Sequence, residues 1–303
     1  MYKILRDPPQ LEHDGLTFSL DYCEPTEFAK SVAKEELRET PENVENGLNE
    51  LRRLLEDEPH LHCPLDNDLW LLSFLRPAHF YPDGALKIIK DYFNYRQKFP
   101  DLCKDLKLQT VYGVLHDYNG SMLPKRDQHG RRLFVSLQGK YWDTEKVTKE
   151  SLLQSFIVQC EYFRSEPETQ ISGIVIILDV DGLTMDKVLR FTPYFAKSLI
   201  NYLEEGMGIR LKGYHIVNNP KIFDIVFALC KRFMNKKLSS RVHFHRSDMT
   251  SLHRYISPDC LPECYGGTLK TCQQSHGPQF YKLLEKYEND YDKFQEYGLR
   301  NKK

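Results

Sequence analysis

A short and almost entirely aliphatic stretch near the middle of the chain restricts the possible folds most. The residues from Ile171 to Val180 include five consecutive aliphatic side chains, Ile174 to Leu178. A run of this length without polar alternation is typical of a strand that is buried on both faces of a mostly parallel sheet. The strand ends in Asp179-Val-Asp181-Gly182, where we interpret the two aspartates as turn and capping residues rather than as cation ligands.

Other strand-like segments lie on both sides of this one, and helix-like segments separate them. We expect strands over residues 132–138, 171–180, 211–217 and 242–245, and helices over residues 147–165, 192–204 and 220–234. This alternation predicts an α/β fold in which right-handed crossovers connect the strands of a mostly parallel sheet.

The first third of the chain has a different texture. Segments with helical spacing of apolar residues, interrupted by prolines, extend from about Phe28 to Leu106, and Thr40-Pro41 is typical of a helix start. We therefore predict a helical N-terminal domain of residues 1–107, an α/β domain of residues 108–272 and a helical C-terminal tail of residues 273–303. In the tail, an apolar stripe between residues 279 and 297 predicts a helix that packs against the body.

The overall composition argues against several classes of function. The chain has 42 basic and 43 acidic residues and a net charge of −1, so no general attraction to nucleic acid is expected. No apolar run reaches the roughly 18 residues of a membrane span, and the start carries no secretion signal. The eight cysteines lack a CxxC pair, so we expect reduced thiols in the cytosol and no metal site.

One segment departs from this neutral balance. Between Arg210 and Arg241 there are eight Lys or Arg residues and a single acid, Asp224. The predicted helix from Pro220 to Met234 lies within this segment and is apolar over far more than the roughly 100° stripe that a surface helix buries. A basic segment with an oversized apolar face predicts a membrane contact.

A second apolar excess surrounds the aliphatic strand. The strand and the connection that follows it carry more apolar side chains than a solid core of this size requires, which predicts a cavity for an apolar molecule. The candidate lining residues are Ile174, Ile176, Leu178, Leu183, Phe191, Leu199, Tyr202, Leu203, Met207, Ile209 and Leu211.

The sequence offers little for catalysis. GxSxG, P-loop and GxGxxG patterns are absent. The densest polar cluster runs from His243 to Asp248 and includes His245 and Ser247, but adjacency in sequence does not make a triad, and no third ligand follows the two histidines. A lipid-processing enzyme that uses these residues stays an alternative, and we expect no catalytic residue.

Six motifs in order and in register resemble the CRAL-TRIO family between Asp66 and Gly267. The resemblance is to its animal branch, which includes α-tocopherol transfer protein, cellular retinaldehyde-binding protein and the clavesins. The matching segments are Leu71–Arg76, Gly139–Asp143, Glu168–Gly173, Leu178–Leu183, His215–Pro220 and Leu261–Gly267.

The resemblance implies a helical N-terminal domain, an α/β lipid-binding domain and a mobile gate helix over about residues 218–241. The gate would add Phe223, Val226, Phe227 and Cys230 to the cavity lining. The resemblance also implies that basic residues bind phosphoinositide head groups, because Lys and Arg donate charge-assisted hydrogen bonds to phosphate. Residue by residue, this role would belong to Arg76, Arg210, Lys212, Lys237 and Arg241.

The sequence departs from the family pattern at several positions. A second arginine after Arg76 is lost, and Arg232 stands where the family has proline, so we expect the gate helix to continue and to set Arg232 beside Lys236. Phe156 and Cys160 replace serines near the tocopherol pocket. These two residues are included in the predicted pocket wall.

The sequence thus predicts a cytoplasmic, monomeric, non-enzymatic carrier. It would bind one hydrophobic small molecule, such as a retinoid, tocopherol or carotenoid, without a cofactor, and exchange it at phosphoinositide-containing membranes to which it binds reversibly. Tyr202 and Ser136 are candidates to hold a polar end of the cargo. The alternative is a protein that transfers or senses phosphatidylinositol or another phospholipid.

Overall fold

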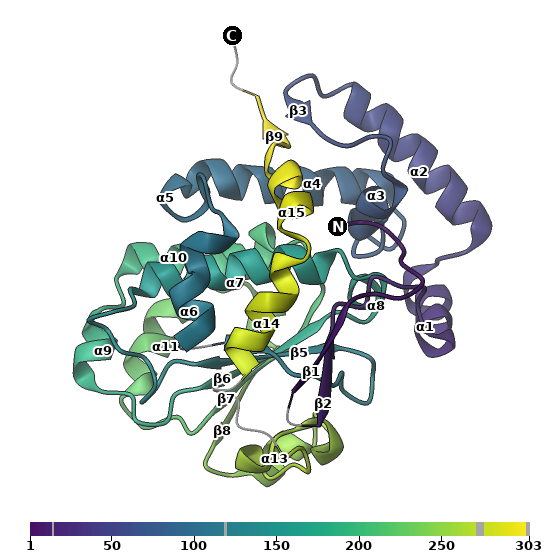
Figure 1. Cartoon of the computed structure of the whole chain (residues 1–303). Helices are drawn as coiled ribbons and strands as arrows, with labels where there is room; N and C mark the ends of the chain where they lie inside the picture. Colours follow the sequence, from purple (N-terminus) through teal and green to yellow (C-terminus); the bar gives the residue numbers. More distant parts are fainter. Residues whose placement is uncertain (14, 118–119, 271–275, 301–303) are drawn as a thin grey trace.

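A five-stranded sheet forms the centre of the computed structural model, which describes residues 1–13, 15–117, 120–270 and 276–300 (Figure 1). The strand order is β4-β5-β6-β7-β8, with β4 antiparallel to β5 and all other pairs parallel. The mostly parallel sheet that the sequence predicts is therefore confirmed. The strands are β4 (Gly120–Met122), β5 (Arg132–Leu137), β6 (Ile174–Asp179), β7 (Leu211–Val217) and β8 (Val242–Arg246).

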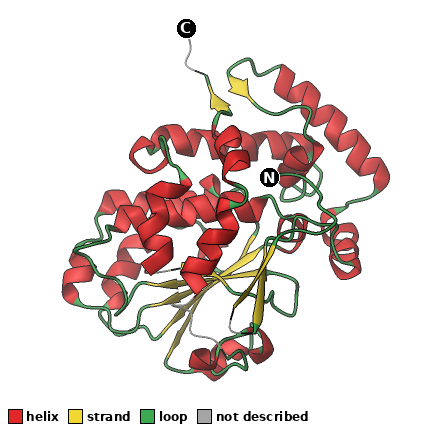
Figure 2. Cartoon of the chain, in the orientation of Figure 1, coloured by secondary structure: helices red, strands yellow, loops and turns green. Residues whose placement is uncertain are grey.

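Helices cover one face of the sheet (Figure 2), and those from α7 to α12 also separate its parallel strands along the chain. They are α6 (Tyr112–Asp117) after η1 (Leu108–Val111), α7 (Lys149–Arg164), α8 (Pro167–Ser172), α9 (Met185–Leu189), α10 (Pro193–Asn201), η2 (Tyr202–Gly206), α11 (Phe223–Lys231) and α12 (Lys236–Ser239). The opposite face is covered by the short elements α13 (Met249–His253), η3 (Pro258–Cys260) and η4 (Glu263–Tyr265).

The side chains of β6 alternate between two cores, as period-two geometry requires. Ile174, Ile176 and Leu178 belong to the large core beneath the helices. Val175 and Ile177 belong to a smaller core with residues of α13 and the segment after it. Both faces of β6 are therefore buried, which explains the unbroken aliphatic run.

The N-terminal region is helical from residue 27 onward. Its helices are α1 (Glu27–Leu37), α2 (Pro41–Glu56), α3 (Asp68–Leu75), α4 (Pro82–Lys98) and α5 (Pro100–Cys103). The predicted start at Thr40-Pro41 is confirmed: the Thr40 hydroxyl accepts a hydrogen bond from the Asn43 backbone N–H at 3.2 Å.

The first residues precede the helical segments that the sequence predicts from about Phe28 onward. They form a hairpin of β1 (Gln10–His13) and β2 (Leu16–Ser19), which contacts α14 (His276–Glu285). Buried and exposed side chains alternate over only four residues in β2, where Phe18 is fully buried. Gly15, in the turn, has a positive φ of 72°, which glycine adopts without steric cost. Four-residue strands carry too little periodic signal to be told from a loop.

The C-terminal apolar stripe packs against the body, as predicted, but in two helices. α14 is followed by α15 (Glu288–Gln295), and β9 (Gly298–Leu299) pairs with β3 (Leu61–His62). Phe280, Leu284 and Tyr291 are buried. The predicted domain boundary between residues 272 and 273 lies outside the described residues.

The predicted continuation of the gate helix through Arg232 is wrong. α11 ends at Lys231, and Asn235 begins α12 by accepting a hydrogen bond from the Leu238 backbone N–H at 2.7 Å. Because an Asn cap starts a new helix, Arg232 and Lys236 are not an i,i+4 pair of one helix. Among the described residues, no helix is long and apolar enough to cross a bilayer.

Candidate functional site

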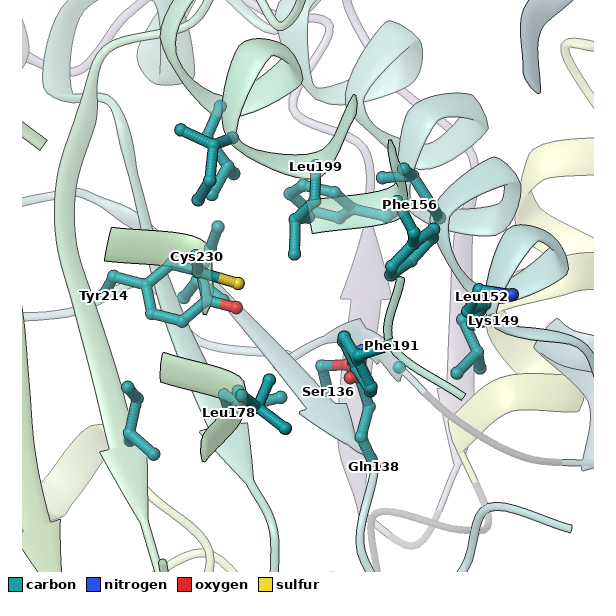
Figure 3. Close-up of a pocket in the computed structure, with 18 of the residues that line it drawn as sticks. Ser136, Gln138, Lys149, Leu152, Phe156, Leu178, Phe191, Leu199, Tyr214 and Cys230 are labelled. Carbon is teal, nitrogen blue, oxygen red and sulfur yellow. The ribbon is translucent and has the colours of Figure 1, made fainter. Parts of the chain in front are cut away.

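A cavity lies between the helix-covered face of the sheet and the helices α7, α10 and α11 (Figure 3). Figure 3 shows Leu178, Leu199 and Phe191 around it, with Tyr214 and Cys230 side by side on another part of its wall. The lining residues are Val114, Gly120, Phe134, Ser136, Gln138, Lys149, Leu152, Leu153, Ser155, Phe156, Gln159, Ile176, Leu178, Phe191, Phe195, Leu199, Ile200, Leu203, Tyr214, Ile216, Phe223, Val226, Phe227, Cys230, Met234, Leu238 and Val242.

Several polar groups of the cavity gather on the wall formed by β5 and α7. Gln138 donates from Nε2 to the Ser136 hydroxyl at 3.0 Å. Gln159 donates from Nε2 to the carbonyl oxygen of Gly120 at 3.0 Å and to the hydroxyl of Ser155 at 3.2 Å. The Oε1 atom of Gln159 is buried and has no hydrogen-bond partner. The wall formed by α10 and α11 is almost wholly apolar, so the cavity suits a mainly apolar molecule with a polar group at one side.

More than half of the predicted lining residues contact this cavity. Because side chains alternate along β6, Ile176 and Leu178 both face the cavity, and the 3.6-residue period of α11 directs its apolar face to the same cavity. The predicted residues that line the cavity are Phe156, Ile176, Leu178, Phe191, Leu199, Leu203, Phe223, Val226, Phe227 and Cys230.

The other predicted lining residues pack elsewhere. Ile174 lies at the start of β6, in the packed core, and Leu183 is only partly buried against that core. Tyr202 lies behind the wall, with its ring 5.2 Å from that of Tyr95 and 5.8 Å from that of Phe156. The remaining exceptions are Cys160 and Met207, which are buried outside the cavity lining, and Ile209 and Leu211, which line a different cleft.

Some lining residues were not predicted from the sequence. Tyr214 and Ile216 follow from alternation along β7, so the sequence carried a signal for them. Lys149 carried no such signal. It is a helix-start lysine whose side chain reaches the cavity edge, where it pairs with Glu150 at 2.7 Å.

A second, basic cleft lies beside the cavity, at the end of the sheet where β7 begins. Arg210 and Lys212 come from the start of β7, Lys237 comes from α12, and Arg241 precedes β8. These four predicted phosphoinositide ligands are therefore brought together, although they are distant in sequence. Three acids, Asp91, Glu204 and Glu205, line the same cleft.

The bases of the cleft raise the local electrostatic potential. The pKa of Lys237 is lowered by burial and by the charges of Arg241 and Arg210. The pKa of Lys212 is lowered by burial and by the charge of Arg210, and a similar combination lowers the pKa of Arg241. A bound anion would offset the repulsion between these bases and would stabilise their protonated forms.

Arg76, the fifth predicted phosphoinositide ligand, is not among the residues that line this cleft. Its side chain is 6% exposed and makes an ion pair with Glu39 at 2.7 Å. A second nitrogen of its guanidinium donates to Gln170 of α8 at 2.5 Å. Arg76 therefore joins the segment between α1 and α2 to the sheet domain. Sequence could not reveal this, because the partners are 37 and 94 residues away.

Replacement of Arg76 by Met is expected to lower the free energy of unfolding by about 3 kcal/mol, because the Glu39 carboxylate then stays largely buried without its partner. Urea denaturation measures the loss. The double variant Arg76→Met/Glu39→Gln should recover part of it. If the Arg76→Met protein were as stable as the parent but bound anionic vesicles more weakly, Arg76 would be a head-group ligand rather than a structural residue.

The histidines that could serve an enzyme lie across the sheet from the cavity. Tyr214, Ile216 and Val242 line the cavity, so alternation directs His215, His243 and His245 to the other face. His245 contacts His215 through Nε2 at 2.9 Å and Ser251 through Nδ1 at 2.6 Å.

The acid of this cluster has another role. Asp248 caps α13 by accepting from the backbone N–H of Thr250 at 3.0 Å. It therefore does not orient His245, and Ser247 lines a different pocket, next to Arg246. The sequence cluster from 243 to 248 is not assembled as a triad. No group of three or more His, Cys, Asp or Glu in the described part of the chain could hold a metal ion.

This histidine cluster is expected to make the fold sensitive to acid. Burial, together with the charges of His245, His243 and Arg131, lowers the pKa of His215 to about 3. Burial lowers the pKa of His245 to about 4, although Asp248 opposes the shift. Because the unfolded state takes up protons near pH 6.5 and the folded state does not, the free energy of unfolding falls as the pH falls below 6.5.

For His215 this loss amounts to about 2 kcal/mol at pH 5. His215→Asn, which keeps a hydrogen-bonding group near Nδ1, should show a smaller difference in unfolding free energy between pH 7 and pH 5. Urea denaturation at both values measures it. An equal pH dependence in the variant and the parent would show that His215 is not the group responsible.

The fold and the cavity together define a class: an α/β protein whose apolar cavity is covered by a short helix next to a basic cleft. Residues 116–267 match the CRAL/TRIO domain family. The chain belongs to this family.

Curated relatives extend the similarity beyond the domain. The human protein named "Alpha-tocopherol transfer protein-like" is 34% identical over 262 residues, which are 86% of this chain and 75% of that protein. Rat Clavesin-2 is 28% identical over 269 residues, covering 88% of this chain and 80% of its own. Among solved structures, Sfh5 aligns with a TM-score of 0.44 and 17% identity, over 93% of this chain and all of its own.

Proposed function

We propose that this protein is a non-enzymatic carrier that binds one hydrophobic small molecule and exchanges it at phosphoinositide-containing membranes. One observation carries the proposal: the apolar cavity and the basic cleft share wall residues. Leu203 and Leu238 line both. Lys237, next to Leu238, belongs to the cleft, so a head group bound there contacts the segment that closes the cavity.

The lining of the cavity supports a mainly apolar cargo with one polar group. Retinoids, tocopherols and carotenoids with a hydroxyl or carbonyl end have this character. Gln159 offers a buried acceptor without a partner, and Ser136 and Ser155 add hydroxyls on the same wall. A buried acceptor without a partner costs free energy that a donor on the cargo would recover. The name of the human relative, "Alpha-tocopherol transfer protein-like", agrees with this class of cargo.

Exposed apolar side chains beside the cavity support a membrane-facing surface. Ile225 on α11 is 55% exposed, and Leu189 on the neighbouring α9 is 75% exposed. Met185 at the start of α9 is also exposed, and α9 and α11 are in contact. We propose that this surface enters the interfacial region of a bilayer and that α11 acts as the gate, moving outward to release the cargo.

We further propose that the protein is a cytoplasmic monomer that attaches to membranes peripherally and reversibly and needs no cofactor.

A second candidate is a phospholipid carrier or sensor. Lys149 at the cavity edge favours it, because a lysine there could pair with a lipid phosphate. Its ammonium already pairs with Glu150, so a phosphate would have to compete with that carboxylate.

A transfer assay tests the proposal. Donor vesicles carry either retinol or a fluorescent phosphatidylinositol, and acceptor vesicles contain phosphatidylcholine with or without phosphatidylinositol bisphosphate. We expect the protein to accelerate retinol transfer, and to do so more strongly when the bisphosphate is present. Acceleration of phosphatidylinositol transfer without acceleration of retinol transfer would favour the second candidate. If the protein accelerated neither, the carrier proposal would fail.

A further inference from the structure

A carboxylate of the helical domain already pairs with two of the four bases of the basic cleft. The Oε2 atom of Glu36, near the end of α1, lies 2.9 Å from Arg210 Nη2 and 3.3 Å from Lys212 Nζ. These cations lower the pKa of Glu36 against the opposing effect of its partial burial, so the carboxylate stays charged. Glu36 therefore neutralises two bases that the phosphate of an anionic ligand would otherwise contact.

The other half of the cleft is open. Within the described residues, the side chains of Lys237 and Arg241 make no ion pair and no hydrogen bond. The cleft is thus divided into a free pair of bases and a pair that is neutralised from within the chain. The acids Asp91, Glu204 and Glu205 line the same cleft, but Asp91 pairs with Lys87, and Glu204 accepts from the Asn235 backbone N–H at 2.7 Å.

The contact of Glu36 is separable from the docking of α1. α1 is held by its apolar side, where Ala29, Ala33 and Leu37 pack against Ile171. Its N-terminus is fixed by Thr26, whose hydroxyl donates to Glu168 at 2.9 Å. The Glu36 side chain is 52% exposed, so its carboxylate can turn into solvent while the helix stays in place.

We propose that Glu36 is a built-in competitor that divides the head-group site and sets its response to phosphate number. A head group with one phosphate monoester on its inositol ring binds at Lys237 and Arg241 and leaves Glu36 in place. A head group with two such monoesters reaches Arg210 and Lys212 as well and must displace Glu36 from them. This inference rests on the proposed function of the cleft and adds a determinant of its specificity.

The division has a consequence for membrane exchange. Displacement of a tethered carboxylate lowers the affinity for every ligand that needs all four bases, because the broken ion pair opposes binding. The carrier then leaves the membrane more readily after it has delivered its cargo. Removal of the competing charge should strengthen binding most for ligands that reach both halves of the cleft.

The test compares Glu36→Gln with Glu35→Gln. Both substitutions remove one negative charge from the end of α1. Glu35, however, is exposed, and among the described residues its carboxylate accepts a hydrogen bond only from the Ser31 hydroxyl of its own helix. Binding is measured by flotation with phosphatidylcholine vesicles that contain phosphatidylserine, a phosphatidylinositol monophosphate or a phosphatidylinositol bisphosphate. Soluble inositol bisphosphate serves as a competitor, to separate a free anion from a lipid head group.

We expect Glu36→Gln to bind the bisphosphate vesicles about fivefold more tightly than Glu35→Gln does, with a smaller gain on the other vesicles. An equal effect of the two variants, or an equal gain on all anionic vesicles, would overturn the proposed division of the site. A gain for soluble inositol bisphosphate without a gain for vesicles would overturn the lipid assignment. If the parent protein bound none of these vesicles, the proposed membrane function itself would fail. That outcome differs from a failure of the Glu36 inference, in which the parent protein binds but the two variants behave alike.

Discussion

Replacement of both Lys237 and Arg241 by Glu is expected to reduce binding to phosphatidylinositol bisphosphate vesicles at least a hundredfold. These two bases form the free half of the cleft, and each base near an anionic leaflet contributes about 1 kcal/mol of attraction. Reversal removes both attractions and adds two repulsions within a cleft that already holds Asp91, Glu204 and Glu205. Retinol transfer to bisphosphate-containing acceptors should fall with binding, whereas retinol affinity in solution should not change.

The matched control is the reversal of two bases in the same segment that lie outside the cleft. Lys231 ends α11 and Lys236 begins α12, and both are exposed. Lys231→Glu/Lys236→Glu changes the net charge by the same amount, so a purely global electrostatic effect would weaken binding equally in both variants. Equal losses, or no loss after reversal of Lys237 and Arg241, would contradict a specific role for the cleft.

Enlargement of Ile176 to Phe is expected to weaken binding of the apolar ligand tenfold or more without unfolding the protein. Ile176 lies in the middle of β6 and lines the cavity, so an added ring enters space that the cargo would fill. Because the ring fills a cavity, the cost in stability should be small. Retinol fluorescence titration measures the affinity, and binding to anionic vesicles should be preserved.

The neighbouring residue provides the control. Ile177 is fully buried on the opposite face of β6, in the core with Leu252 and Ile256. Ile177→Phe adds the same volume within this packed core, on the face of β6 that points away from the cavity. It should lower the free energy of unfolding by about 1–3 kcal/mol and leave the ligand affinity of the folded protein unchanged. A loss of ligand affinity in both variants would mean that strand distortion, rather than occupation of the cavity, is responsible.

The periodic features of the fold could be predicted from the sequence. The aliphatic run from Ile174 to Leu178 predicted a strand buried on both faces, because only apolar residues fit both cores. Thr40-Pro41 reported a helix start through local chemistry that does not depend on the rest of the fold. Short elements such as the β1–β2 hairpin carry no comparable signal.

Long-range partners explain most of the errors at the site. The motif suggested a head-group role for Arg76, but whether a guanidinium faces solvent or Glu39 depends on how α3 docks. Apolar character alone also could not separate the cavity wall from the core behind it, as Tyr202 illustrates. In the same way, the contact of Glu36 with Arg210 and Lys212 joins residues that are 174 and 176 positions apart.

The most direct test of the carrier account is identification of what the protein binds in cells. The purified chain is extracted with organic solvent, and the extract is analysed by mass spectrometry alongside an extract of the Ile176→Phe variant. If the protein is a carrier, a single class of apolar small molecule should be enriched in the extract of the parent protein and depleted in that of the variant. Recovery of a phospholipid would favour the alternative cargo. An extract without any apolar ligand, from a protein that also binds none when ligands are added, would contradict the account.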